Sequence, residues 1–128
     1  MKKMVGKARI LIVDDEPHII CPLLLYFSKR GYDVVVTNSS MSVLSSVMPH
    51  GFDIIITDFN MEHLNGIEII NHARRAGFNG KIILMSACCD LNKAERDALG
   101  IDAFFEKPFE LGALHSQVKE WAENQPVC

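Results

Sequence analysis

Five short runs of apolar residues recur along the chain, and four of them are rich in Ile and Val without alternating polar residues. Strands that are buried on both faces have this pattern, which is typical of a parallel sheet covered by helices. A sheet with one face in water would instead alternate apolar and polar residues. The predicted strands are Arg9–Val13, Asp33–Thr37, Asp53–Thr57, Lys81–Met85 and Ala103–Phe105.

The segments between these runs have the spacing of helices. Ile67, Ile70 and Ala73 recur at every third residue. One helix face, with the three–four spacing of apolar residues, is formed by Leu111, Leu114, Val118 and Trp121. A strand followed by a helix, five times over, predicts an α/β fold with right-handed crossovers, in which helices cover both faces of a five-stranded parallel sheet.

Glycines and prolines agree with most of these boundaries. Pro17 and Pro108 stand where the first turn of a helix is expected to begin. Pro22 breaks the pattern, because it cannot donate to the carbonyl of His18. We therefore expect that helix either to bend at Pro22 or to have a loose first turn over Pro17–Cys21. Left-handed caps are expected just past the helical segments, at Gly31, Gly51, Gly77 and Gly100.

The composition limits what such a fold can do. The chain has 128 residues, 48% of them hydrophobic and 23% charged, which predicts one globular domain over 1–128 with its core in 8–123. This excludes disorder, collagen, a disulfide scaffold and a two-domain enzyme with its own substrate lobe. The net charge of −3, with no concentration of Lys and Arg beyond the N-terminus, argues against direct nucleic-acid binding by this segment.

The sequence shows no membrane helix or signal peptide, and together with the cysteine usage this predicts a cytoplasmic location. The longest apolar run, Ile19–Phe27, contains a proline and is far shorter than the roughly 20 residues that a membrane helix needs. The basic N-terminus is not followed by the apolar segment of a signal peptide. Four cysteines without metal-like spacing are expected to be free thiols in a reducing compartment.

Polar residues follow the predicted strands at the edge where an open α/β sheet binds its ligands. They are Asp14, Asp15 and Glu16 after the first strand, Asp58 after the third, Ser86 after the fourth and Lys107 after the fifth. Taken singly, each could be an ordinary helix cap, turn or loop residue. Their combination is what indicates a site, because four strand ends carry side chains with complementary chemistry.

Gathered carboxylates repel one another in a partly desolvated cleft and need a cation. Asp14, Asp15 and Asp58 together carry three negative charges, and Lys107 leaves two, which one divalent ion neutralises. An all-oxygen site of this kind suits Mg²⁺. A carboxylate beside such an ion can accept a phosphoryl group, while Ser86 donates to a phosphoryl oxygen and Lys107 opposes the developing negative charge.

Over nearly all of its length, from Ala8 to about Glu123, the chain resembles the response regulator receiver domain, the phosphoacceptor half of two-component signalling. The motifs that carry the resemblance are ILIVDDEP at 10–17, DIIITDFNMEHLNG at 53–66, ILMSA at 83–87 and FFEKPFE at 104–110. The resemblance implies a flavodoxin-like doubly wound sheet with strand order 2-1-3-4-5.

The resemblance also implies roles for individual residues. Asp58 would be the phosphorylated residue, Asp15 a direct Mg²⁺ ligand and Asp14 its water-linked partner. The backbone carbonyl of Asn60 would complete the protein's metal contacts. The sequence departs from the family in this loop, because Glu62 stands where a proline is usual.

Three more residues have roles in the family pattern. Ser86 would follow the phosphoryl group, and Lys107 would be joined to Pro108 by a cis peptide. Phe104 would be the aromatic switch residue, although the family often has tyrosine there, so any switch must act through ring packing. The charged residues Lys93, Glu95, Arg96 and Asp97 are expected to form a solvated face of the fourth helix.

The function that we infer is a phosphorylation-driven switch and not a turnover enzyme. A histidine kinase or a phosphotransfer protein would phosphorylate Asp58, and the surface around the last strand and helices would change for a downstream protein or output domain. A phosphorylation-dependent homodimer stays open. The alternative is an interaction module of the same fold that ignores phosphorylation.

Two enzyme-like or cofactor-binding rivals fit the sequence less well. A flavin-binding protein would need hydroxyls and glycines after the first strand, where Asp14, Asp15 and Glu16 would repel its phosphate. An aspartate-nucleophile phosphatase would carry its nucleophile and acid two residues apart after the first strand, whereas Asp58 stands alone after the third.

Overall fold

The computed structural model describes residues 8–37, 51–59, 66–87 and 91–123. Within these ranges five strands form one parallel sheet in the order β2-β1-β3-β4-β5, which confirms the predicted fold class and strand order. The strands are β1 (Arg9–Val13), β2 (Asp33–Thr37), β3 (Ile54–Asp58), β4 (Lys81–Ser86) and β5 (Ala103–Glu106). The helices are α1 (Pro17–Lys29), α3 (Gly66–Arg75), α4 (Lys93–Leu99) and α5 (Leu111–Glu123).

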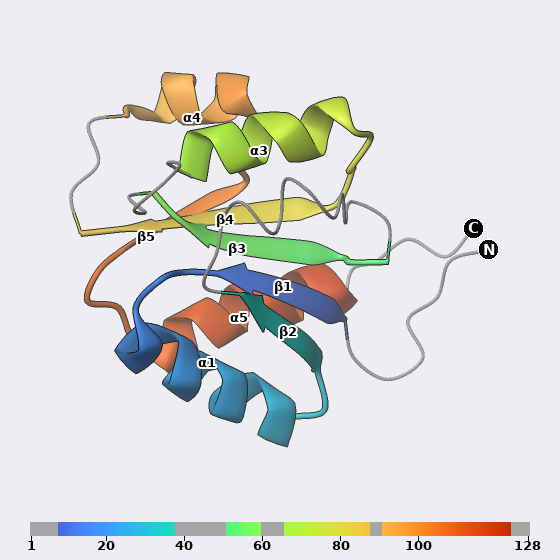
Figure 1. Cartoon of the computed structure of the whole chain (residues 1–128), viewed down its shortest axis with the longest axis vertical. Helices are drawn as coiled ribbons and strands as arrows, with labels where there is room; N and C mark the ends of the chain where they lie inside the picture. The colour runs from blue at the N-terminus through green and yellow to red at the C-terminus, as the bar shows by residue number, and fades with distance from the viewer. Residues whose placement is uncertain (1–7, 38–50, 60–65, 88–90, 124–128) are drawn as a thin grey trace.

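Helices cover both faces of the sheet, with α1 and α5 on one side and α3 and α4 on the other (Figure 1). The strand order explains this division. The chain leaves β1 toward one edge of the sheet, whereas the crossovers from β3 to β4 and from β4 to β5 run toward the other edge. Because these crossovers are right-handed, the helix after β1 lies on the opposite face from α3 and α4.

The core therefore has two layers, one on each face of the sheet. In β1, Ile10 and Ile12 point into the layer beneath α1 and α5, and Leu11 and Val13 point into the layer beneath α3. Successive side chains of a strand point to opposite faces, so a strand covered on both sides needs apolar residues at every position. This is the physical reason for the uninterrupted run in the sequence.

The helix faces agree with the predicted spacing. Ile70 and Ala73 of α3 are buried, as are Leu114 and Val118 of α5. The prediction that Pro108 begins a helix is wrong. The helix α5 begins three residues later, and Pro108 follows a cis peptide bond in the segment after β5.

The first helix begins at Pro17, as predicted, and runs without interruption through Pro22. The carbonyl of Glu16 accepts hydrogen bonds from both Ile19 (2.9 Å) and Ile20 (3.0 Å), which tightens the first turn. The carbonyl of His18 receives no hydrogen bond from Pro22, because proline has no amide hydrogen. Pro22 is exposed, so water can reach that carbonyl instead. The predicted left-handed glycines are confirmed, with φ of 91° at Gly31, 93° at Gly51, 102° at Gly77 and 85° at Gly100.

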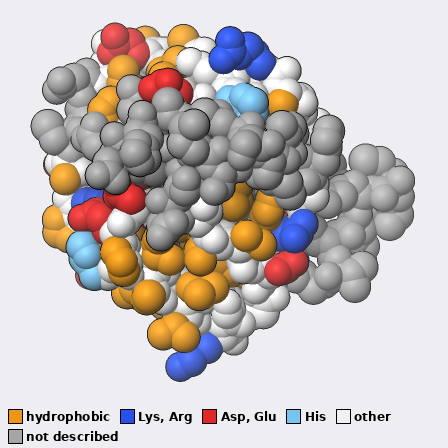
Figure 2. All heavy atoms as spheres, viewed as in Figure 1, with side chains coloured by type: hydrophobic (Ala, Val, Ile, Leu, Met, Phe, Trp, Pro, Cys, Tyr) orange, Lys and Arg blue, Asp and Glu red, His pale blue; other side chains and the backbone are white. Residues whose placement is uncertain are grey.

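The helix expected between β2 and β3 falls outside the described residues. Within the described parts of the chain, no helix is long and apolar enough to cross a membrane. Cys21 is exposed and forms no disulfide, as expected. Hydrophobic side chains gather on the surface over α1 and β2 (Figure 2), where Leu25 is 60% exposed and Val35 36% exposed.

Candidate functional site: an acidic cluster at the carboxyl edge of the sheet

The carboxyl ends of the strands meet at one edge, on the left of Figure 1. Asp14 follows β1 directly, and its amide donates to the carbonyl of Thr37 at 3.1 Å. Asp58 and Ser86 are the last residues of β3 and β4, because the ladders continue one residue further than the apolar runs indicated. Lys107 follows β5, and its amide donates to the carbonyl of Ser86 at 2.8 Å.

The ammonium group of Lys107 lies at the centre of the site. Its Nζ is 3.0 Å from Oδ2 of Asp14, 3.0 Å from Oε1 of Glu16 and 3.2 Å from Oδ1 of Asp58. The side chain of Lys107 is only 9% exposed. Asp14 and Asp58 are buried, at 0% and 5% exposure. The ion pairs of Lys107 with Asp14 and Asp58 are thus largely shielded from water, whereas the side chain of Glu16 is 44% exposed. The site brings together residues from opposite ends of the chain.

The backbone around the site keeps these side chains in place. The amide of Glu16 donates to Oδ1 of Asp14 at 3.0 Å, which leaves Oδ2 for Lys107. The amide of Phe59 donates to the carbonyl of Met85 at 2.8 Å and extends the pairing of β3 with β4 beyond Asp58. The Lys107–Pro108 peptide bond is cis, as the family resemblance implied.

Burial and mutual repulsion shift the carboxylates toward the protonated form. Burial, followed by the charge of Asp14, raises the pKa of Asp58 to about 6, although the charge of Lys107 acts in the opposite direction. Burial also raises the pKa of Asp14, against its hydrogen bond from Lys107. Burial would lower the pKa of Lys107, but its hydrogen bonds to Asp14 and Glu16 outweigh that effect and raise it.

The donor set fits a hard divalent cation. One carboxylate oxygen from each of Asp14, Glu16 and Asp58 can be chosen so that all three lie within 4.8 Å of one another. Three carboxylates against one ammonium leave two negative charges at the site. Carboxylate oxygens without His or Cys ligands favour Mg²⁺ over the transition metals. A bound cation would favour the charged form of Asp58, whose pKa is raised mainly by burial and then by the charge of Asp14.

The structure brings together Asp14, Asp58 and Lys107 from the predicted set, with Ser86 fully buried one residue beyond the Asp58–Met85 pair. Asp15 is exposed, and the group of candidate ligands within the described residues does not include it. Asn60 lies outside the described residues.

Glu16 is the residue that sequence reasoning passed over. It is absent from the predicted set of metal ligands and catalytic residues, yet its carboxylate contacts Lys107. The signal for it was the run of three consecutive acidic residues, Asp14, Asp15 and Glu16, ahead of Pro17. Which of the three turns back toward the sheet depends on where the helix begins.

The predicted switch residue, Phe104, lies on β5 beside Leu84 of β4 and is half-buried. The guanidinium carbon of Arg96 lies 5.1 Å from the centre of its ring. The prediction of a solvated face for the charged run of α4 is therefore wrong at Arg96, which is half-buried. It holds for Lys93 and Asp97, which are exposed and form an i,i+4 ion pair at 2.9 Å.

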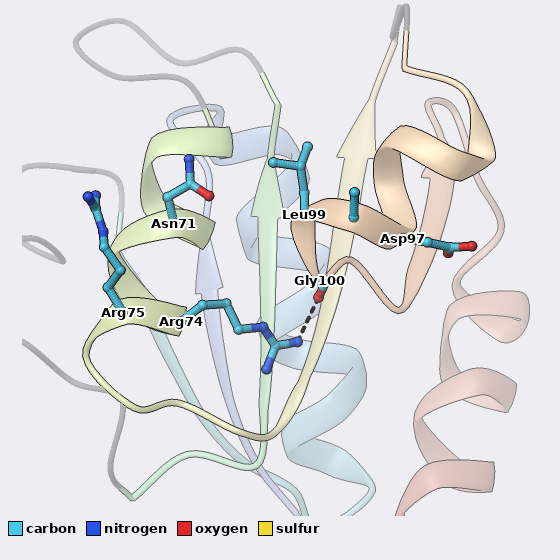
Figure 3. Close-up of a pocket in the computed structure, with 7 residues that line it drawn as sticks. Asn71, Arg74, Arg75, Asp97, Leu99 and Gly100 are labelled. Carbon is cyan, nitrogen blue, oxygen red and sulfur yellow. Dashed lines mark hydrogen bonds between the residues drawn. The ribbon is translucent and has the colours of Figure 1, made fainter.

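Of the hollows that the described residues line, two lie against helices. One, of about 170 Å³, adjoins the site and is lined by His18, Ile19, Pro22, Leu23, Lys107, Pro108, Phe109 and Leu111. The other, of about 420 Å³, is an open pocket between α3 and α4, away from the acidic cluster (Figure 3). Arg74 in its wall is occupied by protein acceptors, including the carbonyl of Gly100 at 2.6 Å.

Comparison with known proteins gives a consistent family. Sporulation initiation phosphotransferase F of Bacillus subtilis is 30% identical over 114 residues, which cover 88% of this chain and 92% of that protein. The transcriptional regulatory protein KdpE of Mycobacterium tuberculosis is 29% identical over 78% of this chain. The chain spans only 44% of that regulator and 48% of the regulatory protein TorR of Escherichia coli.

Solved structures agree with this result. The receiver domain of a Francisella response regulator superposes with a TM-score of 0.83 at 26% identity and covers 94% of this chain and 100% of that one. A CheY-like receiver domain protein of Methanospirillum hungatei gives a TM-score of 0.84 at 25% identity, over 93% and 96% of the two chains. The response regulator receiver domain profile matches residues 10–119. The chain belongs to the response regulator receiver domain family, whose members act in two-component phosphorelay signalling.

Proposed function

We propose that this chain is a phosphorylation-driven switch in which Asp58 accepts a phosphoryl group. Receiver domains are signalling modules that interact with histidine kinases and output domains. The observation that carries the proposal for this chain is the position of Asp58, which is buried and only 3.2 Å from the ammonium group of Lys107. A carboxylate placed this way is both held in position and next to a fixed positive charge.

The transfer follows from the chemistry of the site. A carboxylate oxygen of Asp58 attacks phosphorus of a phosphohistidine, and the bond between phosphorus and the imidazole nitrogen breaks as the imidazole leaves. Lys107 supplies positive charge where the phosphoryl oxygens gather negative charge, and the hydroxyl of Ser86 donates to one of them. Later attack of water on phosphorus returns the free carboxylate. The chain thus catalyses only its own phosphorylation and dephosphorylation.

Mg²⁺ is the proposed cofactor, and when bound it supplies charge that shields the phosphoryl oxygens from the carboxylates. The proposed ligands are Asp14, Asp15, Asp58 and the backbone carbonyl of Asn60. The acidic cluster supports Asp14 and Asp58 directly and adds Glu16 as a further candidate. Without a cation, the negative charges of the cluster would repel an incoming phosphoryl group.

The proposed donor is a histidine kinase or a histidine phosphotransfer protein, and the proposed setting is the cytoplasm. The hollow beside Lys107, lined by apolar side chains of α1 such as Ile19, Pro22 and Leu23, supplies apolar surface next to the site, which suits a protein donor. We propose the whole chain as one receiver domain that acts on a downstream protein or output domain through β5, α4 and α5. We propose no direct binding of nucleic acid or membrane by this chain.

The experiment is labelling by a small phosphodonor, phosphoramidate, in the presence of Mg²⁺, read by intact-protein mass spectrometry. Wild-type protein should gain one phosphoryl group. Asp58→Asn should gain none, because its amide is not a nucleophile. Asp97→Asn is the matched control, since Asp97 is an exposed carboxylate on α4, away from the site, and should leave labelling unchanged.

Labelling of Asp58→Asn at the wild-type level would overturn the assignment of the phosphoacceptor. If wild-type protein is not labelled and its partner binds equally well with and without beryllofluoride, a mimic of the phosphoryl group, the chain acts as a phosphorylation-independent interaction module instead. Steady release of phosphate from a simple phosphate ester would indicate a phosphatase.

A further inference from the structure

Arg96 connects α4 to the segment between β4 and α4 and to Phe104 on β5. Its Nη1 donates to the carbonyl of Leu91 at 2.8 Å, in the segment between β4 and α4. Its guanidinium carbon lies 5.1 Å from the ring centre of Phe104 on β5, within the range of a cation–π contact. One side chain thus bridges the start of α4 and the strand beside β4.

The rest of α4 is only weakly held to the sheet. The helix has seven residues, Lys93–Leu99, and none of them is buried. Its capping box stabilises only the helix's own first turn. The amide of Glu95 donates to Oδ1 of Asn92 at 2.8 Å, and the amide of Asn92 donates to Oε1 of Glu95 at 2.9 Å. An element with few buried apolar contacts can shift at a small cost in free energy.

The two ends of α4 are held differently. Arg74 of α3 donates to the carbonyl of Gly100 at 2.6 Å and anchors the C-terminal end (Figure 3). Between α3 and this C-terminal end lies the open pocket of about 420 Å³, lined on the α4 side by Asp97, Ala98, Leu99 and Gly100, so that little packing supports the last turn besides Arg74. Toward its N-terminal end, Arg96 supplies the contacts to Leu91 and Phe104.

Phe104 connects these contacts to the site. In the parallel ladder Phe104 pairs with Leu84, and Ser86 lies two residues further along β4. Residues two apart on a strand share a face, and paired residues of parallel strands do so too. The ring of Phe104 and the hydroxyl of Ser86 therefore lie on the same face of the sheet, beneath α3 and α4.

We propose that Arg96 is a positioning residue that holds the ring of Phe104 in its resting place and so opposes the phosphorylated state. The proposal rests on the proposed function, because it assumes that phosphorylation of Asp58 draws Ser86 and then Phe104 inward. The contact with Arg96 exists in the resting protein and is lost when the ring turns in. Its removal therefore favours the active state.

The test compares binding of beryllofluoride with Mg²⁺ in wild-type protein and in Arg96→Gln, followed by NMR of backbone amides. Gln can still donate toward the carbonyl of Leu91 but has no charge to place over the ring. We expect Arg96→Gln to bind the mimic about 2- to 5-fold more tightly, the effect of losing one partly exposed cation–π contact. In the free variant, the resonances of Phe104 should move part of the way toward their beryllofluoride-bound positions.

Two further variants separate this role from general effects. Lys93→Gln removes an exposed positive charge from the same helix and should not tighten binding, since Lys93 contacts Asp97 and not the ring. In a Phe104→Leu background, Arg96→Gln should have no further effect, because the ring that it holds is gone. Urea unfolding of each variant reports any loss of stability, which by itself would not tighten binding.

Equal or weaker binding of the mimic by Arg96→Gln, with wild-type binding intact, would overturn the role of Arg96 and leave the proposed function standing. A 2- to 5-fold effect that persists in the Phe104→Leu background would also overturn it, because the effect would not pass through the ring. If wild-type protein binds no beryllofluoride, the proposed function itself fails, and this inference fails with it.

Discussion

At the scale of single residues, the surroundings of Asp58 disfavour the charged form of its carboxyl group. The carboxylate is 5% exposed and lies beside Asp14, and the ammonium of Lys107 offsets only part of the repulsion. A group whose proposed role requires the charged form thus has a raised pKa. Such shifts are typical of functional sites, where burial and like charges are brought together.

The first prediction concerns the pH dependence of stability without metal. The pKa of Asp58 is about 6 in the folded protein and close to 3.8 when unfolded. Between these values the folded state binds more protons, so its stability falls as pH rises from about 4 to 6. Asp58→Asn removes this loss. The difference in unfolding free energy between variant and wild type should grow with pH, by an amount on the order of 3 kcal/mol.

Urea unfolding at several pH values in the presence of a chelator, followed by circular dichroism, measures this difference. Asp97→Asn is the control, because Asp97 is exposed and its replacement relieves no buried charge. A difference for Asp58→Asn that stays constant from pH 4 to 7 would contradict the raised pKa.

At the scale of elements, the start of α3 fits closely against the end of β3. Gly66 is the first residue of α3, and its amide donates to the carbonyl of Phe59 at 2.7 Å. A Cβ atom on Gly66 would press against the carbonyl oxygen of Asp58 and lie 3.1 Å from its carbonyl carbon. Both neighbours are backbone atoms, so neither can turn aside as a side chain would.

The second prediction follows from this close approach. Gly66→Ala should lower the free energy of unfolding by about 1–3 kcal/mol, the usual effect of overpacking, and should weaken labelling of Asp58 by displacing its backbone. Gly112→Ala is the matched control in α5, since a Cβ there meets nothing within 4 Å. It should be neutral or stabilise by up to about 1 kcal/mol. Equal effects of the two substitutions would refute the steric argument.

At the scale of the whole molecule, the layer beneath α1 and α5 joins the two ends of the described chain. Leu114 of α5 is fully buried there, together with Ile10 of β1 and Phe27 of α1. The packing of the last helix therefore depends on the first strand and the first helix. Loss of one large side chain from this layer weakens the molecule as a unit.

The third prediction is that Leu114→Ala lowers the free energy of unfolding by about 2–5 kcal/mol, the usual range for a buried leucine. That is a large part of the roughly 5–15 kcal/mol that stabilises a typical domain. Leu25→Ala, at a leucine that is 60% exposed, is the matched control and should change stability by less than about 0.5 kcal/mol. Thermal and urea unfolding measure both, and similar losses would contradict the two-layer description.

Much of the architecture was predictable because local patterns report burial directly. Residues 10–13 are apolar on both sides of β1 because helices cover both faces of the sheet, and the glycines with positive φ mark the chain reversals. The start of α5 was predicted wrongly at Pro108, because proline is common both in the first turn of a helix and after a cis peptide bond in a turn.

The sequence by itself determined the order of strands and helices and which polar residues stand at the strand ends, because burial and turn geometry depend on neighbouring residues. Only the tertiary structure decided the partners. Lys107 reaches Asp14 across 93 positions of sequence, Glu16 turns toward the site, and Arg96 lies over Phe104. Such contacts depend on how crossovers bring distant elements together, and no local pattern encodes the distance between two side chains that meet only in the folded chain.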